Sequence, residues 1–200
     1  MVRRQPGGSH RADDLTAKAR ICHAALDLFA QHGIAGTALR AVAAEAGVTV
    51  GLIVHHYGTK DALREAVEAS VVEQFAAAIA SVPLDVEPRH VAEARDRAVA
   101  EMLAAKPAIV DYLRRAILDD DVQRGSLVQR LTQLSIEQVN QLRAAGVAST
   151  SHAVSQQVII IMVRQLGRLF LQPLIDRIAD EFSDDTAPAA RPQLVVDVTY

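Results

Sequence analysis

The chain has 200 residues, half of them hydrophobic, and a formal net charge of −3. This length and composition allow a sizeable buried core, and the slightly negative charge argues against a protein that coats nucleic acid over its whole surface. Aromatic residues make up only 4% of the chain, which favours an all-α fold over a β-rich one.

The charges are unevenly distributed along the chain. Through residue 60 there are seven Lys or Arg against four Asp or Glu, whereas the remainder holds 14 basic and 20 acidic residues. The basic end is therefore the predicted partner of phosphates. The lone Cys22 cannot form an intrachain disulfide or a cysteine-based metal site.

Neither a membrane span nor a signal peptide is predicted. The apolar run 158–163 is bounded by Gln157 and Arg164, far short of the roughly 18 to 20 residues that a span requires. The N-terminus lacks the apolar stretch of a signal peptide. We therefore expect a cytoplasmic protein with no membrane partner.

The N-terminal third is predicted to form a flexible basic arm over 1–12 and then a series of helices. From Asp13, apolar residues such as Ile21 and Phe29 recur with helical spacing, and Gly33 is expected to end this first helix.

Capping residues divide the next stretch into short helices. Thr37 is predicted to cap a second helix that Gly47 ends, and Thr49 to cap a third that Gly58 ends. Thr59 then begins a longer fourth helix. With Ala43 and Gly47 small where the helices approach, helices two and three fit a helix-turn-helix.

The rest of the chain is predicted to be helical up to a C-terminal tail. Helices are expected at 89–105, 107–119, 123–145, 151–172 and 173–182, the last separated by Pro173. The tail 184–200 mixes Asp, Thr, Ala and Pro and is predicted to be disordered, although the segment at Leu194 has the apolar residues to dock locally.

Several spaced elements between Ala19 and Lys60 agree with one protein family at once. They are Ala19-Arg20-Ile21, Leu28-Phe29-Ala30, His32-Gly33-Ile34, Thr37-Ala38-Leu39-Arg40, Ala46-Gly47-Val48-Thr49 and His56-Tyr57-Gly58-Thr59-Lys60. This stretch resembles the N-terminal domain of the TetR family. The resemblance implies a three-helix DNA-binding domain at 13–60 and a helical ligand-binding and dimerisation domain at 61–183. It also implies a dimeric repressor that leaves a palindromic operator when a small-molecule effector binds.

The predicted DNA contacts centre on the third helix. Its residues off the Leu52-Ile53 side are expected to face bases, with valine methyl groups against thymine methyls. Arg40 resembles a family position that reaches the DNA and is the predicted main specificity contact. The full predicted set is Thr37, Arg40, Thr49, Val50, Gly51, Val54, His55, His56, Tyr57 and Lys60.

Some of these assignments have alternatives. Packing of Tyr57 against the first helix is as well supported as a phosphate contact, and Lys60 fits either a solvated side chain or a charge beside helix-start amides that attract an anion. Val54 and Ala38 depart from the Tyr and the Ser or Thr that are frequent in the family, which leaves the operator and the affinity open.

The second domain is predicted to dimerise and to hold the effector. The stretch 158–170 is apolar on more than one face, as a helix paired across a two-fold axis would be, although an intrachain core fits as well. Pocket candidates, each also compatible with plain core, are Met102, Leu103, Ile109, Tyr112, Leu113, Leu134, Met162, Arg164 and Gln165. Arg164 fits either a ligand carboxylate or a protein salt bridge.

No enzyme, cofactor or metal is predicted. The chain contains no phosphate-binding glycine loop, nucleophile elbow, zinc-helix motif or kinase signature. The adjacent His55 and His56 diverge by about 100° on a helix and cannot chelate a metal together. The alternative to a DNA-binding regulator is a helical interaction module that has lost DNA binding.

Overall fold

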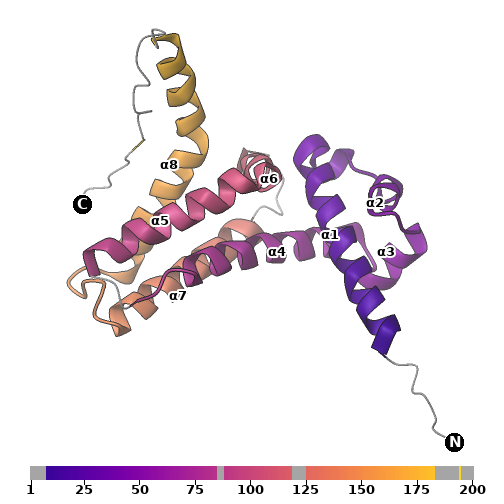
Figure 1. The fold of residues 1–200 in the computed structure, drawn as a ribbon, viewed down its shortest axis with the longest axis horizontal. Helices are drawn as coiled ribbons and strands as arrows, with labels where there is room; N and C mark the ends of the chain where they lie inside the picture. The colour runs from indigo at the N-terminus through magenta and orange to yellow at the C-terminus, as the bar shows by residue number, and fades with distance from the viewer. Residues whose placement is uncertain (1–7, 85–87, 119–124, 183–193, 195–200) are drawn as a thin grey trace, which may run out of the picture. The chain divides into compact units, whose positions relative to one another are not determined.

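The computed structural model describes residues 8–84, 88–118, 125–182 and 194. This part of the chain forms helices without any strand, which confirms the predicted all-α class. The helices are α1 (Gly8–Gly36), α2 (Leu39–Ala46), α3 (Val50–Tyr57), α4 (Lys60–Ala80), α5 (Pro88–Ala105), α6 (Pro107–Leu118), α7 (Gly125–Ala144) and α8 (Val154–Glu181) (Figure 1). Most of the predicted arm and all of the predicted tail except Leu194 lie outside the described residues.

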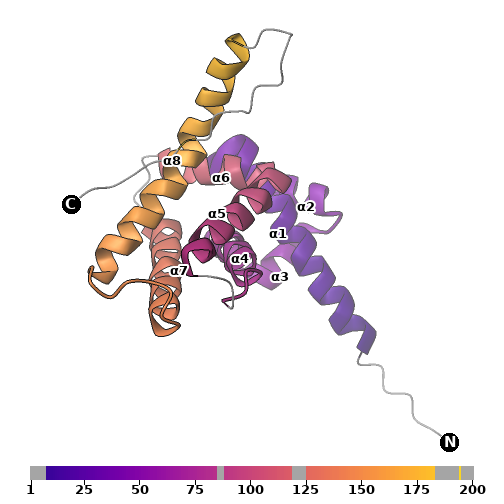
Figure 2. The same ribbon diagram turned by 60° about the vertical axis from the view of Figure 1, so that its left-hand side comes forward.

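The helices fall into two compact units. Unit 1 comprises Met1–Gln74 and Leu103–Leu127, and unit 2 comprises Phe75–Met102 and Val128–Tyr200. In unit 1, α1 packs against α2, α3 and α6 (Figures 1 and 2). Side chains from α1, α2, α3, α4 and α6 form its core, among them Ile21, Phe29, Val42, Ile53, Leu63, Ile109 and Tyr112, each at most 1% exposed.

Helix boundaries follow the predicted stop signals more closely than the predicted starts. Gly47 and Gly58 follow α2 and α3 with positive φ angles, as expected of glycines that end helices, whereas Gly33, with φ 73°, interrupts α1, which continues to Gly36. However, α1 begins at Gly8 rather than at Asp13. The expectation that Gly47 is small because helices approach there is wrong, since no atom lies within 4 Å of a Cβ built at Gly47.

Thr37 does not cap α2, contrary to the prediction. The cap position is Ala38, which has no side-chain hydrogen bond to offer. Thr37 is 3% exposed, and its hydroxyl donates to the carbonyl oxygens of Gly33 at 2.8 Å and Leu28 at 3.2 Å. Its side chain therefore serves the end of α1, because Gly33 is the residue at which the helical conformation is interrupted.

Helix α8 runs without interruption where two helices were predicted. Pro173 lies inside it, because proline removes one backbone hydrogen bond but its φ angle still matches that of a helix. Contrary to the sequence expectation, α8 is long and apolar enough to cross a membrane by length and composition alone. The same length and composition occur in core and interface helices of soluble proteins, so they do not identify a span.

Candidate nucleic-acid interface

The helix-turn-helix of unit 1 is fixed at its helix ends. The Thr49 side-chain oxygen accepts a hydrogen bond from the Leu52 amide at 3.3 Å, which confirms Thr49 as the cap of α3. Between the helices, Gly47 adopts the left-handed conformation, with φ 63° and ψ 40°. The turn between α2 and α3 is therefore set by backbone geometry and one capping hydroxyl.

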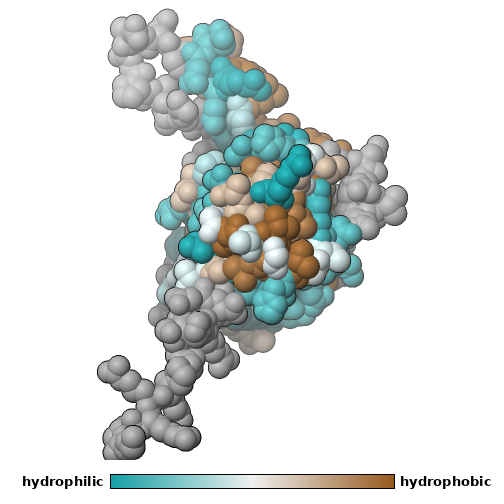
Figure 3. Space-filling view, turned by 90° about the vertical axis from the view of Figure 1, so that its right-hand side faces the viewer, coloured by the Kyte–Doolittle hydropathy of each residue, from teal (hydrophilic) through white to brown (hydrophobic). Residues whose placement is uncertain are grey.

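Helix α3 has one buried and one exposed side, as predicted. Ile53 is 1% exposed and anchors the helix, whereas Val50 is 40% and Val54 48% exposed. Gly51 and His55 are also exposed. Figure 3 shows hydrophobic residues gathered on the face of unit 1 that α2 and α3 form, with hydrophilic residues around them. A small apolar patch on a polar surface suits contact with thymine methyl groups.

Arg40 lies on the exposed side of α2, in its first turn. Its guanidinium carries a fixed charge and can bind either a guanine edge or a phosphate. Six of the predicted contact residues are exposed on α2, on α3 or in the turn between them. They are Arg40, Thr49, Val50, Gly51, Val54 and His55.

Tyr57 is used for packing rather than for a free phosphate contact. Its hydroxyl donates to the Lys18 carbonyl oxygen in α1 at 2.9 Å, which uses the one hydrogen that a phosphate would need. Burial, with a smaller effect from Cys22, raises the pKa of Tyr57 to about 12. The Lys18 ammonium lies 5.8 Å from the Tyr57 ring centroid. Sequence reasoning missed Lys18 because its partner is 39 residues away.

His56 and Lys60 also have neighbours inside unit 1. The half-buried His56 ring makes edge contacts with the rings of His55 and Tyr57, at centroid distances of 5.5 and 6.2 Å. The Lys60 ammonium donates to the Ala35 carbonyl oxygen at 3.4 Å. The Thr59 hydroxyl accepts from the Ala62 amide at 3.1 Å, which confirms that Thr59 caps α4.

The predicted pocket residues are divided between the two units, and the pocket itself stays a prediction. Leu103, Ile109, Tyr112 and Leu113 belong to unit 1, and Met102, Leu134, Met162, Arg164 and Gln165 to unit 2. Within unit 1, three of them fill the core: Ile109, Tyr112 and Leu113 are at most 2% exposed. In unit 2, Arg164 and Gln165 both bind Asp96, so the protein salt bridge foreseen for Arg164 is present.

The fold and the exposed α3 define a class, the all-helical proteins with an N-terminal helix-turn-helix. Residues 21–67 match the sequence profile described as "Bacterial regulatory proteins, tetR family". This N-terminal part of the chain is therefore similar to the corresponding part of tetR family regulators.

Two curated relatives match the same end of the chain. The HTH-type transcriptional regulatory protein RaaS of Mycobacterium tuberculosis is 48% identical over 65 residues, which are 32% of this chain and 30% of RaaS. The HTH-type transcriptional repressor Rv3405c, also from M. tuberculosis, is 51% identical over 49 residues, or 24% of this chain and 26% of the repressor. The matches therefore span less than a third of either relative.

Solved structures resemble more of the chain. A tetR family transcription regulator from Shewanella sp. PV-4 aligns with a TM-score of 0.66 at 22% identity, covering 83% of this chain and 90% of that one. The multidrug binding protein EbrR aligns with a TM-score of 0.57 at 26% identity, covering 86% and 82%. The likeness to the Shewanella protein establishes the fold.

Proposed function

We propose that this protein is a transcriptional repressor that binds a palindromic DNA operator as a homodimer and releases it when a small molecule binds. The observation that carries the proposal is α3, a helix of two turns capped by Thr49 and anchored by Ile53, whose opposite side exposes Val50 and Val54. Such a helix fits the major groove of DNA. The similarity to Rv3405c, which is described as a transcriptional repressor, supports repression rather than activation.

A stripe of exposed apolar side chains on α8 supports a homodimer. The α8 stripe consists of Ile159, Val163, Leu171, Leu174 and Ile178 together with Phe182 directly after the helix, with exposed fractions between 37% and 84%. Contiguous apolar surface of this kind is unfavourable in water and marks an interface. A second copy of the same helix would cover it with a matching surface across a two-fold axis, and a two-fold protein suits a palindromic operator.

Release by a small molecule is supported by a solved relative. EbrR is described as a multidrug binding protein and was solved in complex with imidazole. The curated relatives are regulators rather than enzymes, so we propose that this chain likewise acts without catalysis, in the bacterial cytoplasm.

Selection of bound fragments from a fragmented bacterial genome, followed by gel-shift titration at several salt concentrations, tests DNA binding. We expect palindromic fragments and an affinity that falls linearly with salt on a log-log scale, because phosphate contacts release counterions. No retention of any fragment at low salt would instead support the alternative, a helical interaction module that has lost DNA binding.

Arg40 and Lys60 are expected to make different contributions. Arg40→Ala should relax the preference at particular base pairs by about 1–3 kcal/mol, whereas Lys60→Ala should weaken binding to all sequences alike and reduce the salt slope by about 1. Fluorescence anisotropy with matched and mismatched operators measures both effects. The exposed Arg97 of unit 2 provides a control, because Arg97→Ala removes a charge that is not part of the helix-turn-helix. Identical behaviour of the Arg40 and Lys60 variants would contradict these roles.

A further inference from the structure

The partly or fully buried charges of unit 2 do not balance. Among its described residues they are Arg95, Asp96, Arg143, Arg164, Arg168 and Asp176, whereas the described glutamates of unit 2 are all exposed. Four cations and two anions are thus partly or fully removed from water, and only Arg95 is in the fully buried class. Removing a charge from water is costly unless an opposite charge compensates it.

Arg95 on α5 is the most buried of these cations. It is 7% exposed, and its two terminal nitrogens donate to the side-chain oxygens of Gln138 at 2.8 Å and Gln141 at 3.4 Å on α7. Both acceptors are neutral amides. The third nitrogen, Nε, is buried and has no hydrogen-bond partner in the part of the chain that the structure describes. Desolvation lowers the pKa of Arg95, in keeping with the lack of a nearby carboxylate.

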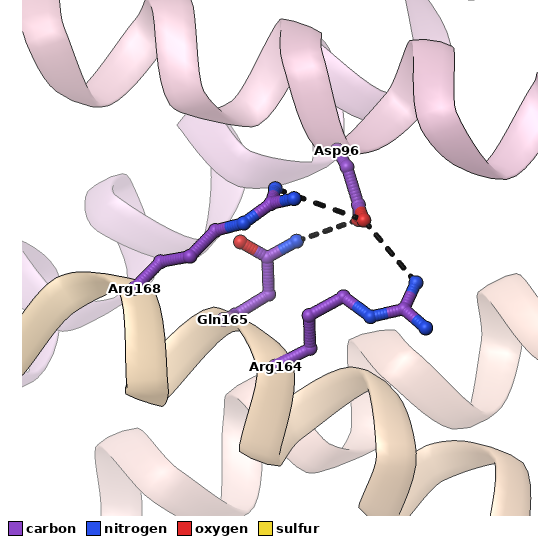
Figure 4. A network of polar contacts seen from close by, with 4 residues as sticks. All are labelled: Asp96, Arg164, Gln165 and Arg168. Atoms are coloured by element: carbon purple, nitrogen blue, oxygen red, sulfur yellow. Dashed lines mark hydrogen bonds and ion pairs between the residues drawn. The ribbon is translucent and has the colours of Figure 1, made fainter. Parts of the chain in front are cut away.

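The neighbouring carboxylate, Asp96, is already shared by three donors from α8. Gln165 donates to Oδ1 at 2.8 Å, while Arg164 and Arg168 approach Oδ2 at 3.4 and 3.7 Å (Figure 4). One negative charge therefore serves two guanidinium groups, and the buried Nε of Arg164 has no hydrogen-bond partner among the described residues. Asp96 is not available to compensate Arg95 as well.

Buried apolar residues lie one turn from Arg95 on α5 and one turn from its partner Gln138 on α7. Val91 and Val99, one turn before and after Arg95 on α5, are 0% and 3% exposed. On α7, Leu134 and Leu142 flank Gln138 by one turn on each side and are both 9% exposed. A molecule bound at Arg95 would therefore have these apolar residues of α5 and α7 within a turn of the cation.

We propose that unit 2 binds a small molecule that carries an anionic group on an apolar body, and that Arg95 is the residue that pairs with the anion. This inference rests on the proposed function, since it names the chemical class of the effector. A carboxylate or phosphate beside Arg95 would supply the missing negative charge and an acceptor for Nε, and charge-assisted hydrogen bonds of this kind are the strongest. The apolar body would occupy the surroundings formed by α5 and α7.

A series of ligands with one tail and different head groups tests the class of effector. Isothermal titration of the full-length protein would compare decanoate, decyl phosphate, 1-decanol and decyltrimethylammonium, all below their micelle concentrations. We expect decanoate or decyl phosphate to bind at least tenfold more tightly than the alcohol and the cation. The anion with the higher affinity then shows whether the effector carries a carboxylate or a phosphate. Equal affinity for all four, or tighter binding of the cation, would overturn the proposal.

Substitution of Arg95 tests the residue. Arg95→Met should lower the affinity for the preferred anion at least tenfold and change that for 1-decanol less than threefold. It should also raise the melting temperature of the ligand-free protein, because it removes an uncompensated buried charge at similar volume. A merely structural Arg95 would instead lower the melting temperature and leave the head-group preference intact, which would overturn the assignment.

Three controls complete the experiment. Arg97→Met changes an exposed arginine on the same helix and should behave as wild type. Arg95→Lys keeps the charge and should retain the preference for anions, so it decides the case if Arg95→Met does not fold. Gel-shift of the ligand-free protein separates the two hypotheses: DNA binding without a preference for anions refutes this inference alone, whereas a preference for anions without DNA binding refutes only the proposed function.

Discussion

Gly51 lies on the exposed side of α3, where a side chain is sterically allowed but would project from the surface. A Cβ built at this position would meet only the Thr49 Oγ1 atom, at 3.8 Å, which is an ordinary van der Waals contact. The fold therefore does not require glycine at position 51. Any loss of DNA affinity on substitution would report on the approach of DNA to α3.

We predict that Gly51→Ala stabilises the protein by up to about 1 kcal/mol, because alanine loses less backbone entropy in a helix. We also predict that it lowers operator affinity about tenfold, since the added methyl group would keep the DNA away. Thermal unfolding and fluorescence anisotropy measure the two effects. Gly36→Ala at the end of α1 is a matched control, because its Cβ would meet only His32 Cβ at 3.8 Å. An unchanged operator affinity for Gly51→Ala would show that this residue does not lie against DNA.

At the scale of elements, α6 holds the end of α1 through one side chain. The Arg115 guanidinium donates from Nε to the Ala30 carbonyl oxygen at 2.6 Å and from Nη2 to that of Gln31 at 2.8 Å. These carbonyls lie just before Gly33, whose conformation interrupts the helix. Arg115 thus satisfies acceptors that a helix end would otherwise leave to water.

Arg115→Ala is predicted to reduce the free energy of unfolding by about 1–2 kcal/mol, since it removes two hydrogen bonds from a charged donor. Urea titration followed by circular dichroism measures the loss. Arg114, on the same helix, contacts the Asp111 carboxylate at 3.5 Å, so Arg114→Ala should cost less than about 0.5 kcal/mol. Equal losses for the two variants would mean that the contact with α1 contributes nothing specific.

Two tyrosine hydroxyls, the half-buried one of Tyr57 and the buried one of Tyr112, connect α3 to α1 and α6 to α4 within unit 1. Tyr57 binds the Lys18 carbonyl oxygen, and Tyr112 lies 3.5 Å from the Glu68 carboxylate, which also accepts from Arg64 at 2.6 Å. Burial raises the pKa of Tyr57 to about 12, and burial together with the charge of Glu68 raises the pKa of Tyr112. Ionisation of either phenol is therefore harder in the folded protein than in the unfolded chain.

Because both pKa values are raised by folding, the associated stability is present below about pH 10 and is lost as the pH rises toward 12. We predict that urea stability measured from pH 8 to 11.5 falls more steeply in the wild type than in a Tyr57→Phe, Tyr112→Phe double variant. The third tyrosine, Tyr200, is present in both proteins and serves as an internal control. Parallel curves for the two proteins would refute the prediction.

At the scale of the whole molecule, assembly is predicted to depend on the α8 stripe. Leu171→Glu combined with Ile178→Glu should convert a dimer to a monomer, because four charges would be buried in the symmetric interface without partners. Sedimentation velocity measures the mass, and Arg177→Glu, at an exposed position on the same helix, is the control. A wild-type protein that sediments as a monomer at micromolar concentration would rule out the α8 dimer.

The features that could be predicted from the sequence are those that depend on residues close together in the chain. The fold class, the cap at Thr49, the stop at Gly47 and the exposed side of α3 all depend on residues within one or two turns of each other, and the structure agrees. The sequence could not predict contacts between distant segments. Thr37 has the sequence position of a helix cap, but its hydroxyl donates to the carbonyl oxygens of Leu28 and Gly33. The partner of Tyr57, the Lys18 carbonyl oxygen, lies on another helix.

The second half of the chain was less predictable for the same reason. An apolar run looks the same whether it lines a pocket, fills a core or faces a partner, so the pocket residues named from sequence divide between the two units. The charge imbalance of unit 2 emerges only when burial is known, because Arg95 and the exposed Arg97 are indistinguishable in sequence.

The open space around Gly47 has a consequence for which residues can replace it. With nothing within 4 Å of an added Cβ, substitution at this turn is limited by torsion angles and not by volume. Asparagine, which visits the left-handed region readily, should therefore be tolerated better than the smaller alanine, and valine least of all. The stability of variants at position 47 should therefore follow how readily each residue adopts a positive φ angle. Crowding between two helices would instead make stability follow side-chain size.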